Sequence, residues 1–125
     1  MSERYMILIR EPENHQTLAE DARAAEQARI HAAHTAFFEA ISAAGATFED
    51  GAGLTPANTA VRIIPARDGK PAVFTDGPFG ETKEVISGYY TVSVPDAATA
   101  RELAAKCPTG GWVELWPIMD TSSGA

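Results

Sequence analysis

An unbroken apolar run, residues 5–9, lies near the start of the chain and is rich in residues that favour strands. A run without polar alternation predicts a strand that is central in its sheet or covered on both faces. Further along, Thr17 and Glu20 have the spacing of a capping box, and residues 18–44 include many alanines but neither glycine nor proline. This pattern predicts either one long helix that stops at Gly45 or a short leading helix packed beside a main one.

One face of this predicted helix carries a regular apolar stripe. Ile30, Phe37 and Ile41 recur at the spacing that brings side chains onto one side of a helix. His34 falls on the same stripe. We therefore expect the stripe to face the core and His34 to point inward.

Beyond the helix, the pattern changes to short extended segments separated by turns: 46–49, 58–64, 72–75 and 87–94. Asp68-Gly69, between the second and third of these segments, is a sequence typical of a two-residue hairpin turn. The last segment places large apolar residues on one face by simple alternation: Tyr90, Val92 and Val94. The pattern thus predicts a hairpin that is followed by another strand.

A second helix and a last strand complete the pattern. Asp96 is a good N-cap residue, and Pro108 prevents the helix from continuing. Between them, small and apolar residues repeat on one helical face: Ala100, Leu103, Ala104 and Cys107. Residues 112–119 are extended and apolar, whereas residues 120–125 are small and polar and are expected to fray.

The predicted order is strand, long helix, several antiparallel strands, helix, strand. We predict an α+β fold, with a ferredoxin-like antiparallel sheet, two helices on one face and an added β-hairpin. A single domain over residues 1–119 and a frayed tail at 120–125 account for the chain. Such a sheet leaves one face without helices, and residues 112–119 carry more large apolar side chains than one end normally exposes to water. We therefore expect a homodimer that buries this face.

Composition narrows the functions that such a fold could serve. The 125 residues are 45% hydrophobic and 22% charged, as in an ordinary globular domain. Seventeen acidic residues against ten basic ones give a net charge of −7, which disfavours direct binding to nucleic acid. The sequence has neither a signal-peptide pattern nor an apolar stretch long enough to span a membrane, so we expect a cytoplasmic protein. The single cysteine, Cys107, excludes an intramolecular disulfide and is expected to be a buried, inert thiol.

The densest polar segment is the turn Thr75-Asp76-Gly77-Pro78-Phe79-Gly80-Glu81-Thr82-Lys83-Glu84. Glycine and proline constrain this turn, and Phe79 could anchor it by burying its ring. It is either a functional loop on a rigid scaffold or an ordinary solvated turn. In the first case Lys83 binds a substrate carboxylate or phenolate, and Glu81 or Glu84 orients it. In the second case these residues form surface ion pairs.

Three motifs together resemble the YCII-related protein family, in its DGPF branch: Tyr5-Met6-Ile7-Leu8-Ile9, the turn from Thr75 to Glu84, and Gly88-Tyr89-Tyr90. The resemblance spans almost the whole chain. It implies a ferredoxin-like fold of the dimeric α/β-barrel type, which agrees with the predicted order of elements. It does not imply one established reaction.

The wider family has a proposed active-site pair, a histidine on the first helix and an aspartate, and one relative is a dehydrochlorinase that acts on a chlorinated aromatic. By this resemblance, His34 corresponds to the histidine and Asp76 to the aspartate. An imidazole titrates near neutral pH, and a carboxylate can fix its tautomer and stabilise its charged form. The competing interpretation is a core histidine satisfied by a backbone carbonyl or a buried water. At Trp116 the chain departs from the branch, which commonly has an arginine before the following proline.

The first functional expectation is a small enzyme that needs neither a cofactor nor a metal. It would be a lyase or dehydrochlorinase-like catalyst of proton transfer, using His34 and Asp76 on a small anionic or aromatic substrate. The candidate substrate-binding residues are Lys83, Glu81, Phe79 and Tyr89. Because Tyr89 and Tyr90 alternate along a strand, only one of them can point into a cavity on one face of the sheet.

The alternative is a non-catalytic protein that binds a ligand or acts as an accessory factor. Genes of the DGPF type often lie beside those of extracytoplasmic-function sigma factors. A link to transcription would then run through protein contacts, because the acidic charge opposes a direct DNA reader.

Overall fold

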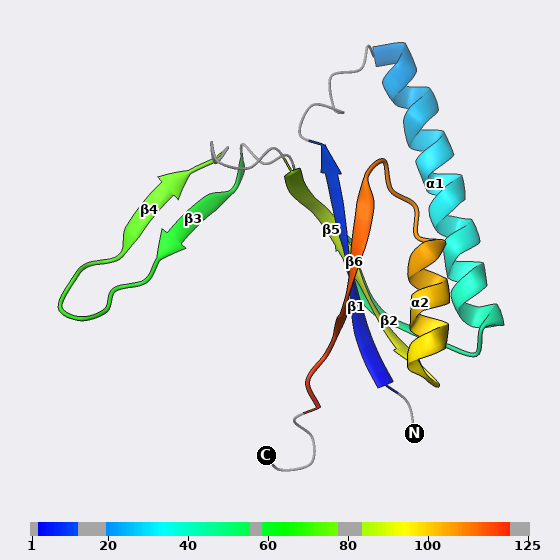
Figure 1. Ribbon diagram of the computed structural model, residues 1–125. Coiled ribbons are helices and arrows are strands. Elements are labelled where there is room, and N and C mark those ends of the chain that lie inside the picture. The colour runs from blue at the N-terminus through cyan, green and yellow to red at the C-terminus, as the bar shows by residue number, and fades with distance from the viewer. Residues whose placement is uncertain (1–2, 13–19, 56–58, 78–83, 121–125) are drawn as a thin grey trace.

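Two helices lie against one face of a four-stranded antiparallel sheet, and a separate β-hairpin projects from the end of that sheet (Figure 1). The computed structural model describes residues 3–12, 20–55, 59–77 and 84–120. In chain order the elements are β1 (Glu3–Pro12), α1 (Glu20–Ala43), β2 (Thr47–Gly53), β3 (Val61–Ile64), β4 (Val73–Asp76), β5 (Glu84–Val94), α2 (Ala97–Ala105) and β6 (Trp112–Pro117). The sheet order is β2-β5-β1-β6, and β3 and β4 form the hairpin. This arrangement confirms the predicted α+β fold.

β1 lies inside the sheet, between β5 and β6, as its unbroken apolar run predicts. Successive residues of a strand point to opposite faces. Ile7 is completely buried on the helix-covered face and is paired with Tyr90 on one side and Leu115 on the other. Its neighbour Leu8 is half-buried on the opposite face. The core is therefore built where alternate residues of three strands meet the two helices.

α1 is one continuous helix of 24 residues. Of the two predicted alternatives, the single long helix is the one that forms. The helix stops before Gly45, whose φ of +75° lies in the left-handed region that glycine adopts readily. Phe37 and Ile41 are both buried, at 2% exposure each, as predicted. Thr17 of the expected capping box lies outside the described residues. Neither α1 nor α2 is long and apolar enough to cross a membrane.

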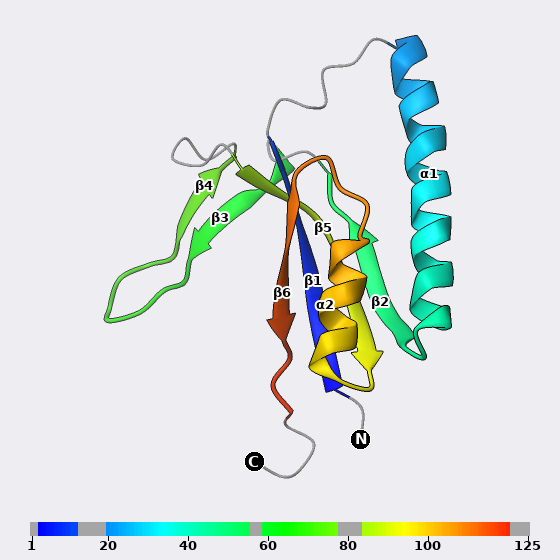
Figure 2. The ribbon, with the colours of Figure 1, turned by 45° about the vertical axis from the view of Figure 1, so that its right-hand side comes forward.

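The first half of the α1 stripe is more open than predicted. His34 is half-buried, and Ile30 is 40% exposed, so the prediction that Ile30 faces the core is wrong. In Figures 1 and 2 the first turns of α1 extend past the end of the sheet. A periodic stripe identifies the inward face of a helix, but it does not say how far the opposing sheet reaches.

α2 packs on the same face of the sheet as α1 (Figure 2). Asp96 caps it as predicted, because its Oδ1 atom accepts a hydrogen bond from the backbone N–H of Thr99 at 2.8 Å. The predicted inward residues of this segment are all buried: Ala100, Leu103, Ala104 and Cys107. Burial raises the pKa of the Cys107 thiol to about 12, which makes a thiolate unfavourable at neutral pH.

The β3–β4 hairpin forms at the predicted turn. Asp68 and Gly69 have φ values of 52° and 75°, as a two-residue turn of this kind requires, and Arg67 pairs with Lys70 across it. Among the described elements, β3 and β4 pack extensively only against each other. Figures 1 and 2 both place the hairpin on the side of the sheet opposite to the helices.

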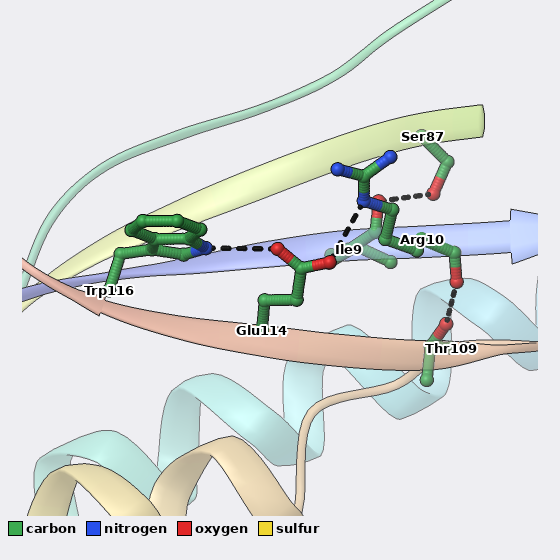
Figure 3. Close-up of polar contacts among 6 residues, drawn as sticks. All are labelled: Ile9, Arg10, Ser87, Thr109, Glu114 and Trp116. Atoms are coloured by element: carbon green, nitrogen blue, oxygen red, sulfur yellow. Dashed lines mark hydrogen bonds and ion pairs between the residues drawn. The ribbon is translucent and has the colours of Figure 1, made fainter. Parts of the chain in front are cut away.

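We call the sheet face without helices the open face. β6 contributes Trp112 and Trp116 to it, with exposures of 39% and 56%. Trp116 donates from Nε1 to Glu114 at 3.0 Å, and the other carboxylate oxygen of Glu114 lies 3.2 Å from Nε of Arg10 (Figure 3). Two further apolar residues of β6 instead pack against the core on the helix-covered side: Val113 and Leu115. Alternation therefore divides the apolar cluster of this strand between two faces.

Candidate functional site

A cavity of about 340 Å³ opens between α1 and the end of the sheet formed by β1, β2 and β5. We call it the His34 cavity. Its chemistry comes from His34 on α1, Tyr90 and Ser87 on β5, and Glu11 on β1. One helix and two strands thus bring an imidazole, a phenol, a hydroxyl and a carboxylate to one opening.

A larger groove, of about 530 Å³, lies between α2 and β6. Apart from Tyr5 and Arg101, its described lining is aliphatic. Its described lining residues include no pair of groups that could exchange a proton near neutral pH. Size alone therefore does not identify the functional site, and the smaller cavity at His34 is the better candidate.

Tyr90 and His34 meet inside the His34 cavity. α1 carries His34 over the sheet, β5 carries Tyr90 on the helix-covered face, and the phenol oxygen is hydrogen-bonded to Nδ1 of the imidazole. The ring centroids are 5.7 Å apart and the planes are inclined by 46°. Both side chains stand on regular elements, so the pair is held in place by the scaffold before any ligand arrives.

Burial sets the protonation of both groups. It raises the pKa of Tyr90 to about 12, so the hydroxyl keeps its proton at neutral pH. Burial also lowers the pKa of His34, and the charge of His31 lowers it further, whereas the charge of Glu11 raises it. A neutral imidazole that accepts the Tyr90 hydrogen bond at Nδ1 carries its own proton on Nε2. In this tautomer the Tyr90 hydroxyl donates and Nδ1 accepts, whereas in the other neutral tautomer Nδ1–H donates to the phenol oxygen.

Aromatic rings surround Tyr90 and form a wall of the cavity. The ring centroid of Tyr90 lies 5.0 Å from that of Phe37, 5.8 Å from that of Phe38 and 6.2 Å from that of Phe48. Phe38 and Phe48 also line the cavity and meet edge to face at 5.0 Å. Gly51 lets backbone and rings approach closely, because a Cβ there would lie 2.9 Å from the backbone oxygen of Tyr89 and 3.1 Å from both Phe48 and Tyr90. The wall suits a flat apolar ring.

A bulge in β5 brings a second polar pair to the cavity. The register between β1 and β5 shifts after Ile9, which leaves Ser87 as an extra residue in β5. The Ser87 hydroxyl donates to Oε1 of Glu11 at 2.7 Å, and the backbone oxygen of Ile9 lies 3.5 Å from the same hydroxyl (Figure 3). Glu11 is thereby oriented beside the cavity, where its negative charge favours the protonated form of His34.

The structure does not bring Asp76 to His34. Asp76 ends β4, pairs with Val61 in the hairpin, is exposed and does not line the His34 cavity. The hairpin and α1 lie on opposite sides of the sheet (Figures 1 and 2). Within the described part of the chain, the carboxylate that acts on His34 is Glu11, because the hairpin carries Asp76 away from the helices.

Tyr89 and Tyr90 alternate as expected, and Tyr90 is the one that meets His34. Tyr89 is paired with Leu8, and its hydroxyl donates to Oδ2 of Asp50 at 3.1 Å. This hydrogen bond raises the pKa of Tyr89. Tyr89 borders the cavity, but its hydroxyl is engaged with Asp50 on the open face.

The remaining predicted binding residues belong to the segment that precedes β5 in the sequence. Phe79, Glu81 and Lys83 lie outside the described residues. Their expected roles, as anchor, orienting acid and anion-binding cation, stay predictions.

Sequence reasoning missed three groups of the site. The sequence leaves open whether Tyr89 or Tyr90 enters the cavity and makes only Tyr89 a candidate binding residue, and neither Glu11 nor Ser87 is a candidate in the sequence. One local signal was available for Ser87, because Gly88 inside a strand pattern indicates a bulge. No local signal marks Glu11, which reaches Ser87 across 76 positions of sequence.

Comparison with known families gives a clear result at the level of the domain. The sequence profile of the YCII-related domain matches residues 3–121. No curated protein matches the chain. The match covers nearly all of the 125 residues and agrees with the four-stranded sheet, two helices and hairpin described above. The fold is of the dimeric α/β-barrel type, and the chain belongs to the YCII-related domain family.

Proposed function

We propose that this protein catalyses proton transfer on a small molecule bound in the His34 cavity. The observation that carries the proposal is the hydrogen bond between the Tyr90 hydroxyl and Nδ1 of His34, in a cavity that also holds Glu11. An imidazole whose proton-accepting atom is already paired with a phenol is suited to receive a proton through that phenol. The family resemblance, in which His34 corresponds to the histidine of a proposed active-site pair, supports the same role for this residue.

The proposed step moves one proton through two groups. The Tyr90 oxygen takes a proton from the ligand while the Tyr90 hydroxyl proton passes to Nδ1 of His34. Tyr90 is unchanged by this exchange, His34 becomes an imidazolium, and the ligand becomes an anion. Glu11 stabilises the imidazolium by its charge, and the reverse movement returns the proton to another atom of the ligand. Glu11 replaces Asp76 as the acid of the pair in this proposal.

The proposed ligand is a small aromatic compound that carries hydroxyl groups. Phe38 and Phe48 offer ring faces, and Ser87 and Glu11 offer hydrogen bonds at the rim. The motif from Thr75 to Glu84 supports placing the chain in the DGPF branch, and Lys83 in that motif remains the proposed partner of a phenolate oxygen.

We also propose that a second copy of the chain packs on the open face. Trp112 and Trp116 stand exposed on it, and Met119, just beyond β6, is 81% exposed. The dimeric α/β-barrel type to which the fold belongs supports this partner.

Resorcinol tests the proposed chemistry, because its ring C–H groups exchange with D2O through proton transfer. Proton NMR in D2O should show faster loss of the ring signals in the presence of the wild type. His34→Gln should lose this acceleration by about 100-fold or more, the usual contribution of one acid–base group. Tyr90→Phe should lose it as well.

Tyr5→Phe is the matched control for Tyr90→Phe. Tyr5 is also a buried tyrosine, but its hydroxyl donates to Glu3 at 3.0 Å and it does not line the His34 cavity. Its variant should exchange resorcinol protons as the wild type does. If resorcinol shifts the NMR signals of His34 on binding but the wild type does not accelerate exchange, the non-catalytic ligand-binding alternative is correct. Tighter binding of benzoate than of resorcinol, lost in Lys83→Ala, would instead indicate an anionic substrate.

A further inference from the structure

The β3–β4 hairpin exposes apolar side chains on both of its faces. The register places Ile63 beside Phe74 on one face and Ile64 beside Val73 on the other. Their exposures are 52% and 66% on the first face and 45% and 51% on the second. No described helix or strand covers either face extensively.

Such a hairpin needs a partner surface. An isolated two-stranded hairpin is at best marginally stable in water, and monomeric proteins rarely leave apolar patches of this kind uncovered. A tight turn at Asp68-Gly69 gives the hairpin a defined shape, but it does not bury these side chains. The stabilising contact therefore has to come from outside the hairpin.

The position of the hairpin identifies the surface that it reaches. Figures 1 and 2 show it descending on the side of the sheet opposite to the helices, which is the side of the open face. A partner molecule packed against Trp112 and Trp116 on the open face would lie on the same side of the sheet as the hairpin. One partner can therefore cover both apolar surfaces.

We propose that the hairpin is an arm that clasps a second copy of this chain. In a two-fold dimer each copy offers its open face and its hairpin to the other, so both apolar surfaces are covered reciprocally. Charge favours the same partner. Residues 61–76 hold three basic and two acidic residues, so the hairpin has a small net positive charge. The whole chain holds ten basic and seventeen acidic residues and has a net charge of −7. The basic arm of one copy is attracted to the acidic body of the other. This inference rests on the proposed dimer and is independent of the proton-transfer chemistry.

Sedimentation velocity over a range of protein concentrations tests the arm. The double variant Ile63→Ser/Phe74→Ser should raise the dissociation constant of the dimer by about 10-fold or more, since it removes two large apolar contacts. Ile30→Ser is the matched control, because Ile30 is 40% exposed but lies on α1, on the far side of the sheet. It should leave the dissociation constant unchanged.

Hydrogen exchange supplies a second measurement that does not depend on a variant. The backbone amides of 61–64 and 73–76 should exchange more slowly at concentrations where the wild type is dimeric than on dilution to the monomer. If these amides exchange at the same rate at both concentrations, the inference is overturned. This holds whether they exchange fast at both concentrations or are protected at both by the chain's own sheet.

The outcomes separate the arm from the dimer itself. A wild-type dimer whose dissociation constant is unchanged in Ile63→Ser/Phe74→Ser overturns the arm and leaves the open-face dimer standing. A wild type that stays monomeric at micromolar concentration overturns both. Neither result bears on the resorcinol exchange expected of His34.

Discussion

At the scale of single residues, the neighbours of His34 shift its pKa in opposite directions. Burial and the charge of His31 lower its pKa, and the carboxylate of Glu11 raises it. The Tyr90 hydroxyl, kept protonated by its own burial, occupies Nδ1. A phenol from β5 is therefore hydrogen-bonded to the His34 ring, and the charge of a carboxylate from β1 acts on its pKa.

The lowered pKa of His34 makes the stability of the fold depend on pH. The folded protein holds this proton less tightly than the unfolded chain, so the unfolded state binds more protons as the pH falls below about 6.5. The free energy of unfolding should decrease from about pH 6.5 down to the lower pKa of the folded state, and this contribution should be level at higher pH. Urea denaturation across this range measures it, and His34→Gln should lack this part of the decrease.

Two charge-removing variants should move the pKa of His34 in opposite directions. His31→Gln removes a like charge and should raise it, whereas Glu11→Gln removes an opposite charge and should lower it. An NMR titration of the His34 ring protons measures both shifts. If Glu11→Gln does not lower the pKa of His34, or shifts it in the same direction as His31→Gln, Glu11 is not the neighbouring carboxylate.

At the scale of elements, the end of α1 is determined by backbone conformation. Gly45 adopts a φ of +75°, and a Cβ at this position would meet no atom within 4 Å. Gly45→Ala should therefore destabilise the protein by about 1 kcal/mol through backbone strain alone. Thermal or urea denaturation measures the change.

Gly53→Ala is the control for this prediction. A Cβ at Gly53 also has open space around it, but its φ is not in the left-handed region. The change in stability should stay within about 0.5 kcal/mol, as for other exposed substitutions. Gly45→Asn should fall between the two, because asparagine tolerates the left-handed conformation better than alanine.

At the scale of the whole molecule, the chain divides into a packed body and an uncovered arm. Ile7 is at 0% exposure in the middle of the body, whereas Ile63 is 52% exposed on the hairpin. Ile7→Ala should lower the free energy of unfolding by about 2–5 kcal/mol, the usual cost of a cavity in a core. At concentrations where the protein is monomeric, Ile63→Ala should change it by less than about 0.5 kcal/mol. A comparable loss in both variants would show that the hairpin is packed against its own body.

Local patterns in the sequence were sufficient for most of the elements. The apolar run of β1, the stripe around Phe37, the N-cap at Asp96 and the turn at Asp68-Gly69 are all properties of residues close together in the chain. Periodicity and turn chemistry depend on such neighbours, so these elements could be predicted. His34 could also be placed on the inward face of its helix for this reason.

The candidate site could not be predicted in the same way, because it is formed by contacts between residues far apart in the sequence. Tyr90 meets His34 across 56 positions of sequence, and Ser87 meets Glu11 across 76. The bulge that turns Ser87 toward Glu11 exists only in the pairing of β1 with β5, and the separation of Asp76 from His34 follows from the direction in which the hairpin leaves the sheet. The sequence by itself determined which residue types and which elements are present. Only the tertiary structure decided which carboxylate acts on the histidine, because strand register and the path of the hairpin arise from pairings that no local pattern encodes.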